Sequence, residues 1–249
     1  MINTKINIIK LNETNSTNEF AKSLLKENKQ SLPFAIQSNF QSRGKGQVSK
    51  IWESDKDKNL LLSLVVKAPK IAIEQQFKIS QAISLAIRKI ISNYTPKACI
   101  KWPNDIYIHD NKIAGILIEN TIVGQTIDKC IIGIGLNINQ TLFSENVPNP
   151  TSLKLENNKD FNIDEIRDLI INEIISSLQD LKDIDYTYQN FLYRKGELEQ
   201  FRRADSSSFY GVIIGTDKIG KLLIRTENNQ INSFSNNEIH LIHRRLQEV

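Results

Sequence analysis

The chain has 249 residues, of which 40% are hydrophobic and 24% are charged, and its formal net charge is +4. This length suits one large domain with a small one, and the composition is that of an ordinary globular protein. The weak net charge gives no reason to expect a nucleic-acid partner, and the longest apolar runs are far too short to span a membrane. The N-terminus shows no signal-peptide pattern, so the sequence predicts a cytoplasmic protein.

Apolar runs and apolar residues at helical spacing predict the elements of the first 195 residues. In chain order they are a strand at 6–11, a helix at 19–25, strands at 34–40 and 60–67, a helix at 75–91, strands at 98–101, 106–108, 112–121 and 127–138, and helices at 162–182 and 186–194. Polar loops are predicted at 41–52 and 141–160. Cys99 and Cys130 fall in predicted strands, which indicates reduced core thiols and no disulfide framework.

The pattern of apolar and turn-forming residues changes at about residue 196. Short apolar runs at 209–214, 221–225, 232–234 and 239–242 alternate with turns rich in glycine or asparagine. This spacing predicts a small antiparallel barrel. We therefore expect two domains, at 1–195 and 196–249.

The sequence Ser16-Thr17-Asn18 directly precedes the first predicted helix. These residue types are preferred helix N-caps, so a plain cap is one interpretation. The other is a ligand site, because helix N-termini present backbone N–H groups and short hydroxyl and amide side chains can hydrogen-bond an uncharged polar group.

The polar loop at 41–52 contains two glycines and several cations. Such a loop can surround a carboxylate or a phosphate with backbone amides and positive charge. A Gly-x-Gly pair is a weak signal, however, and a flexible surface loop is the alternative.

The most informative segment is KWPND at residues 101–105, followed by KIAGILIE at 112–119. A lysine at a strand entry, such as Lys112, can place a positive charge beside a ligand, or its charged end can simply reach solvent. Asp105 is either a turn residue or, with Asn104, an oxygen donor near Mg²⁺.

A fourth segment is Gly133-Ile134-Gly135-Leu136-Asn137, where two glycines interrupt a predicted strand. Glycine weakens a strand unless another group must approach closely. A bulged strand is the alternative interpretation.

These four segments, in this order, resemble the catalytic core of biotin protein ligases. The resemblance covers residues 6–195 approximately, and it implies an α+β fold: a mixed, mostly antiparallel sheet with flanking helices, followed by a small C-terminal SH3-like β-barrel. It implies Lys112 as the principal catalytic cation and Asp105 as a residue near Mg²⁺. The residues that it assigns to biotin or the adenylate are Ser16, Thr17, Asn18, Gln41, Gly44, Lys45, Gly46, Gln47, Trp52, Lys101, Asn104, Lys112, Gly115, Gly133, Gly135 and Asn137.

The loop departs from the family's pattern, Gly-Arg-Gly-Arg-x-Gly-Arg-x-Trp, at four positions, one of which, Lys50, keeps a cation in the place of the third arginine. Lys45 stands where the first arginine is usual, Gln47 replaces the second, and Ser49 replaces the third glycine. Lysine supplies charge without the planar, two-pronged grip of arginine, and glutamine supplies no charge.

The resemblance implies a two-step reaction with ATP and biotin as substrates and Mg²⁺ as cofactor. Biotin is first converted to biotinyl-5′-AMP and is then transferred to a specific lysine of a biotin carboxyl carrier protein. We expect the monofunctional form without a DNA-binding domain, because the motif at Ser16 leaves no room before it for a helix-turn-helix module. The alternatives are a lipoate–protein ligase and a non-catalytic biotin-binding protein. We expect no DNA or membrane partner, and a homodimer is possible.

Overall fold

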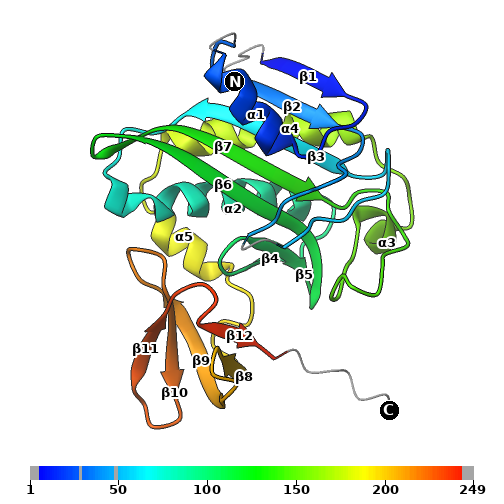
Figure 1. Ribbon diagram of the computed structural model, residues 1–249. Coiled ribbons are helices and arrows are strands. Elements are labelled where there is room, and N and C mark those ends of the chain that lie inside the picture. The colour runs from blue at the N-terminus through cyan, green and yellow to red at the C-terminus, as the bar shows by residue number, and fades with distance from the viewer. Residues whose placement is uncertain (1–5, 28–29, 48–49, 243–249) are drawn as a thin grey trace.

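The computed structural model describes residues 6–27, 30–47 and 50–242 (Figure 1). A seven-stranded sheet has the order β1-β2-β3-β7-β6-β5-β4. β1 pairs with β2 in parallel, and the other neighbouring strands are antiparallel. The strands are β1 (Asn7–Leu11), β2 (Phe34–Ser38), β3 (Leu60–Lys67), β4 (Ala98–Lys101), β5 (Asp105–Ile108), β6 (Asn111–Val123) and β7 (Thr126–Leu136).

Helices cover both faces of this sheet. α1 (Thr17–Lys26) packs on one face with Phe34 and Ile36 of β2, whereas the intervening Ala35 faces the larger core on the other side. That core is covered by α2 (Phe77–Ser92) and α4 (Ile163–Gln179), which pack against each other. The remaining helical segments are η1 (Ile73–Gln75), α3 (Leu153–Asn157) and α5 (Ile184–Asn190). None of the helices in the described residues combines the length and apolar composition that crossing a membrane requires.

The C-terminal strands form a separate antiparallel sheet of five strands with the order β11-β10-β9-β8-β12. They are β8 (Leu198–Arg203), β9 (Ser208–Thr216), β10 (Leu222–Thr226), β11 (Ile231–Phe234) and β12 (Ile239–Leu241). Within the described ranges no ladder joins β11 to β12, so the predicted barrel is an open sheet here. These edge strands are only four and three residues long.

Most of the predicted elements are confirmed, including β3, whose residues are buried except at its end. Two elements went unrecognised. β8 went unrecognised because its sequence, LEQFRR, contains mostly polar residues. Its Glu199 is nevertheless buried, and the Glu199 carboxylate forms an ion pair with the Arg194 guanidinium at 3.0 Å. The short helix α3 lies within the predicted loop at 141–160, and its N-cap is Ser152, whose side chain accepts a hydrogen bond from Leu155 N.

The two cysteines are free thiols, as predicted. Burial raises the pKa of Cys99 to about 11 and that of Cys130 to about 12. Both thiols therefore stay protonated near neutral pH, which makes them poor nucleophiles.

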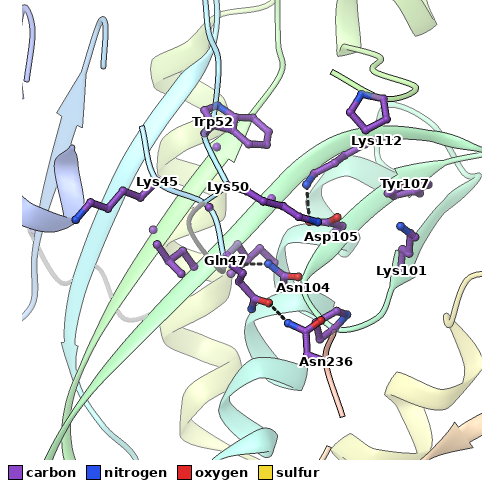
Figure 2. A pocket seen from close by; sticks show the side chains of 18 of the residues that line it. Lys45, Gln47, Lys50, Trp52, Lys101, Asn104, Asp105, Tyr107, Lys112 and Asn236 are labelled. Atoms are coloured by element: carbon purple, nitrogen blue, oxygen red, sulfur yellow. Dashed lines mark hydrogen bonds and ion pairs between the residues drawn. The ribbon is translucent and has the colours of Figure 1, made fainter. Parts of the chain in front are cut away.

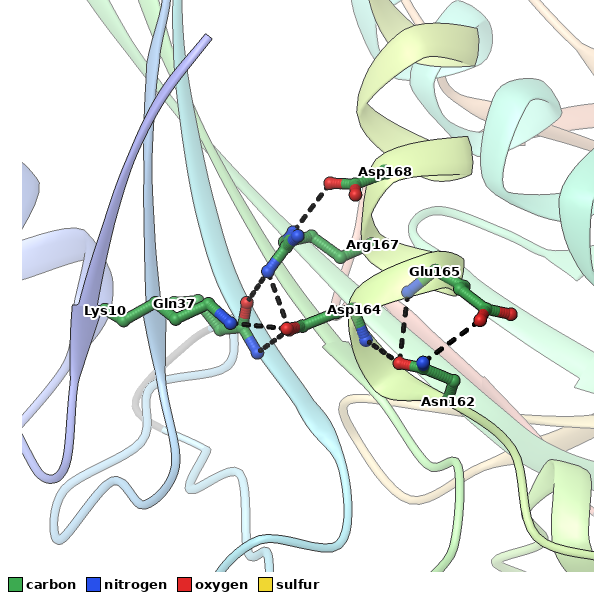
Figure 3. A network of polar contacts seen from close by, with 7 residues as sticks. All are labelled: Lys10, Gln37, Asn162, Asp164, Glu165, Arg167 and Asp168. Atoms are coloured by element: carbon green, nitrogen blue, oxygen red, sulfur yellow. Dashed lines mark hydrogen bonds and ion pairs between the residues drawn. The ribbon is translucent and has the colours of Figure 1, made fainter.

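A polar network joins the start of α4 to the edge of the large sheet (Figure 3). Asp164 accepts hydrogen bonds from Lys10 of β1, from Gln37 of β2 at 3.1 Å and from the buried Arg167 at 2.6 Å. Arg167 also donates to Asp168 at 2.8 Å. Burial raises the pKa of the Asp164 carboxyl, but the hydrogen bonds from Lys10 and Gln37 and the charge of Arg167 outweigh burial and leave the pKa lowered.

We predict that Asp164→Asn lowers the free energy of unfolding at pH 7 by about 1 kcal/mol, because a charge-assisted contact to a buried arginine is lost. Since the folded-state pKa of Asp164 is lowered, its contribution is present above the unfolded pKa and is lost as pH falls through the folded value. Urea titrations from pH 7 to pH 3 should therefore converge for the two proteins. Asp168→Asn, at a more exposed carboxylate, is the control. Parallel curves at all pH values would contradict the prediction.

Candidate functional site

The four motifs meet at one cavity of about 760 Å³. Its walls come from the start of α1, the loop at 41–52, strands β5 to β7 and the C-terminal sheet. Every residue that the sequence assigned to a substrate lines this cavity, with the exception of Gly44. Gly44 instead packs closely against the Trp52 backbone, where a Cβ would come within 2.5 Å of the Trp52 carbonyl oxygen. Ser49 lies outside the described residues.

Uncharged polar side chains form one end of the cavity. Thr17 donates to Gln41 Oε1 through both its backbone N–H, at 2.7 Å, and its hydroxyl, at 3.0 Å. Ser63 Oγ lies 2.7 Å from Thr17 Oγ1 and 2.5 Å from Asn18 Oδ1. Ser16 occupies the N-cap position of α1 in an extended conformation, but its side chain makes no capping hydrogen bond. The residues of this motif thus form a hydrogen-bonded site as well as a helix start.

This end of the cavity presents both hydrogen-bond donors and hydrogen-bond acceptors. Within the described residues, the Ser16 hydroxyl and the Gln41 Nε2 group have no hydrogen-bond partner, and both can donate. Asn18 Oδ1 and Thr17 Oγ1 each have a lone pair beyond the bonds already described. The site therefore matches a small neutral group that carries both an acceptor and N–H donors.

Trp52 covers the middle of the sheet. A Cβ on Gly115 would come within 2.9 Å of the Trp52 ring, and one on Gly135 would overlap the indole. Trp52 Nε1 is buried and has no hydrogen-bond partner within the part of the chain that the structure describes. The glycines of β6 and β7 are therefore needed for close approach, as predicted, and in this structure the group that approaches is the indole.

Two strand lysines, one carboxylate and Lys50 of the loop form the charged part of the cavity (Figure 2). Lys112 Nζ, on β6, lies 2.7 Å from Asp105 Oδ1, and both side chains are largely buried. Lys101 lies 5.0 Å from the centre of the Tyr107 ring. Burial and the charge of Lys112 lower the pKa of Lys101, and together they outweigh Asp105, which raises it. The net result is a lowered pKa. Two cations near one carboxylate leave a local excess of positive charge, which suits an anionic ligand.

Two asparagines hold the backbone next to this charged group. Asn104 donates to the Ile116 carbonyl at 2.7 Å and so fixes the turn between β4 and β5. Asn137 donates to the Thr151 carbonyl at 2.9 Å, while its Oδ1 is buried without a partner in the described residues. An unsatisfied buried acceptor that lines a cavity is available to a ligand donor.

The loop at 41–52 is held by residues outside the motifs. Lys45 Nζ pairs with Glu19 at 2.8 Å. Gln47 Oε1 accepts a hydrogen bond at 2.6 Å from Asn236, which lies between β11 and β12 (Figure 2). Trp102 donates to the Gly220 carbonyl at 2.8 Å and so joins the KWPND turn to the C-terminal sheet. None of these three partner residues was predicted from the sequence.

Ser63, Glu19 and Asn236 contact residues of the candidate site but were not singled out in the sequence. A signal existed for Ser63, which is the one hydroxyl in the otherwise apolar run LLLSLVV. Glu19 directly follows the Ser-Thr-Asn motif, but it resembles any acidic residue in a first helical turn. Nothing local distinguishes Asn236.

Comparison with known proteins identifies relatives of this arrangement. A model of the biotin/lipoate A/B protein ligase family matches residues 11–137. The bifunctional ligase/repressor BirA of Escherichia coli is 28% identical over 203 residues, which cover 76% of this chain and 61% of that protein. The chain thus spans less than two thirds of that relative's length. The biotin–[acetyl-CoA-carboxylase] ligase of Mycobacterium tuberculosis is 30% identical over 117 residues, covering 45% of this chain and 42% of that protein.

A solved structure extends the likeness to nearly the whole chain. The biotin protein ligase of Aquifex aeolicus, in complex with biotin and ATP, superposes with a TM-score of 0.76. The two chains are 25% identical, and the match covers 96% of this chain and 99% of that one. The α+β arrangement predicted from the sequence is therefore confirmed.

We predict that Gly135→Ala displaces the Trp52 indole, because the added methyl overlaps the ring. The Trp52 emission should move to longer wavelength and become more accessible to acrylamide. Gly124→Ala is the matched control, since a Cβ there meets nothing within 4 Å although φ is +62°. Gly124→Ala should lower stability by about 1 kcal/mol and leave the emission unchanged. An unchanged spectrum in Gly135→Ala would contradict the packing described here.

Proposed function

We propose, because the chain belongs to the biotin/lipoate A/B protein ligase family, that it is an ATP-dependent biotin–protein ligase. The proposal rests on two sites that lie in one cavity. The first is the uncharged hydrogen-bonding end at Ser16–Asn18, which we call the neutral site, and the second is the charged part with its lysines. A ureido group, with one acceptor and two N–H donors, matches the first site. The carboxylate of the same molecule would then extend toward the second.

The first reaction step joins two anions, and Lys112 is the residue that we assign to it. A carboxylate oxygen of biotin attacks the α-phosphorus of ATP, the bond to the β-phosphate oxygen breaks, and pyrophosphate leaves with the electron pair. The product is biotinyl-5′-AMP. Lys112 reduces the repulsion between the reactants and stabilises the charge that develops on the phosphoryl oxygens. Asp105 holds the lysine in place at 2.7 Å until the substrates arrive.

The second step transfers the biotinyl group to a lysine of a carboxyl carrier protein. The neutral ε-amine attacks the carbonyl carbon of the mixed anhydride, AMP leaves, and the nitrogen loses a proton as the amide forms. The protein's contribution is to align the groups and exclude water from the anhydride. Trp52 and the loop at 41–52 cover the cavity in a way that fits this role.

The other predicted residues have supporting roles in this proposal. Lys101 would contact nucleotide phosphates, Asn104 would lie on the phosphate or Mg²⁺ side, and Asn137 would contact the adenine or ribose. Within the described residues no three His, Cys, Asp or Glu side chains gather as a metal site. Asp105, with Asn104 beside it, would supply protein oxygens to a Mg²⁺ ion that is bound largely through substrate phosphates.

The wider setting follows from the same proposal. The carrier is a biotin carboxyl carrier domain of an acyl-CoA carboxylase, the reaction takes place in the cytoplasm, and residues 196–249 act as a C-terminal domain beside the cavity. A homodimer through the edge of the large sheet is compatible with the fold.

Biotin-dependent exchange of labelled pyrophosphate into ATP tests the first step, with lipoate and octanoate as parallel substrates. We expect exchange with biotin alone, because the apolar ring of lipoate has no donors or acceptors for the neutral site. Exchange with lipoate instead would show a lipoate–protein ligase. Binding of biotin without any exchange, in folded protein, would show a non-catalytic biotin-binding protein.

We predict that Lys112→Ala lowers the rate of biotin-dependent exchange by about 10²–10³-fold, the cost of removing one charge-stabilising group from an active site. Lys129→Ala is the matched control, since Lys129 also lies on a strand and pairs with an aspartate, Asp128, at 3.5 Å. It should exchange at the wild-type rate. Near-wild-type exchange by Lys112→Ala at saturating substrates would remove Lys112 from the mechanism.

A further inference from the structure

Glu119 lies outside the residues so far given a role, yet it contacts the neutral site directly. It belongs to β6, and its Oε2 accepts a hydrogen bond from Asn18 Nδ2 at 2.8 Å. Its Oε1 accepts from Lys22 at 2.7 Å. Asn18 itself is 3% exposed, so its amide has few partners to choose from. The contact spans about a hundred residues of sequence.

The orientation of the Asn18 amide determines what the site offers a ligand. Its Oδ1 now lies at Ser63 Oγ and against Gly133, where a Cβ would come within 2.6 Å of that oxygen. Ser63 does not fix this orientation, because a hydroxyl can accept from an NH₂ group as readily as it donates to an oxygen. The Leu117 carbonyl, at 3.4 Å from Nδ2, is at the limit of a hydrogen bond.

Glu119 does fix it, because an ionised carboxylate only accepts hydrogen bonds. A turned amide would place Asn18 Oδ1 against the carboxylate, oxygen to oxygen. Lys22 holds Glu119 in place through the 2.7 Å contact, and the hydrogen bond to Glu119 raises the pKa of Lys22, although burial lowers it. Lys22 also contacts Glu19 at 2.9 Å, and Glu19 holds Lys45 of the loop.

We propose that Glu119 is a positioning residue that sets the specificity of the neutral site, by holding Asn18 so that its oxygen accepts an N–H of the ligand head group. The inference deepens the proposed function and rests on it for the identity of that head group. It assigns no role to Glu119 in the chemistry of either step.

Titration calorimetry with biotin and, separately, with ATP tests this assignment. Glu119→Ala should bind biotin about ten-fold more weakly, the effect of losing one hydrogen bond to a charged group, and ATP within about two-fold of wild type. Glu119→Gln should fall between, since its amide oxygen can still accept from Asn18. Glu173→Ala is the matched control, because Glu173 also pairs with a lysine, Lys89, at 2.8 Å. It should change neither affinity.

A second measurement reads the amide orientation without any ligand. In the ligand-free wild type, the Asn18 side-chain amide protons should exchange slowly with solvent in NMR spectra, and in Glu119→Ala they should exchange rapidly. If wild type binds no biotin, the proposed function fails, and this exchange alone decides whether Glu119 orients Asn18. Unchanged exchange, unchanged biotin affinity, or an equal loss for biotin and ATP in Glu119→Ala would each overturn the inference.

Discussion

The close approach of side chains to bare backbone on β6 and β7 is the constraint on which the site depends. Gly115 and Gly135 let the Trp52 indole lie on the sheet, and Gly133 admits the Asn18 amide. With side chains at these positions, neither the loop nor the first turn of α1 could reach the sheet. The loss of β-propensity at three glycines is offset by neighbours such as Ile132 and Ile134, which remain fully or nearly fully buried in the core.

Electrostatics in the cavity follow from this packing. Lys101 and Lys112 are held on strands whose apolar neighbours exclude much of the water, so their charges act in a medium of lower dielectric than the surface. Asp105 offsets part of the cost of burying them, since an unpaired buried charge is strongly destabilising. A ligand anion can replace Asp105 as the partner of the buried lysines. The same buried charges that need a partner in the ligand-free protein are therefore the ones that act in the proposed chemistry.

Local patterns in the sequence were sufficient for the strands and helices of the large sheet, because burial there follows simple periodicity, as in β3 and α2. The motif residues converge as the resemblance implied. Contacts between residues far apart in the sequence could not be predicted from local patterns. Asn236 meets Gln47 from 189 residues away, and Glu199 faces inward because Arg194 neutralises it. Such pairs leave no local pattern, since each partner alone resembles a solvent-exposed residue.

Two of the loop departures, Lys45 and Gln47, have partners that explain their effect on charge. Lys45 pairs with Glu19 on α1, and Gln47 with Asn236 beside the C-terminal sheet. A lysine that is paired in the ligand-free protein must exchange one anion for another to reach a phosphate, so its net gain on binding is smaller than that of a free cation. A glutamine contributes position and no charge. In the proposed reaction, charge stabilisation therefore depends chiefly on Lys101 and Lys112, which β-strands hold more rigidly than a loop can.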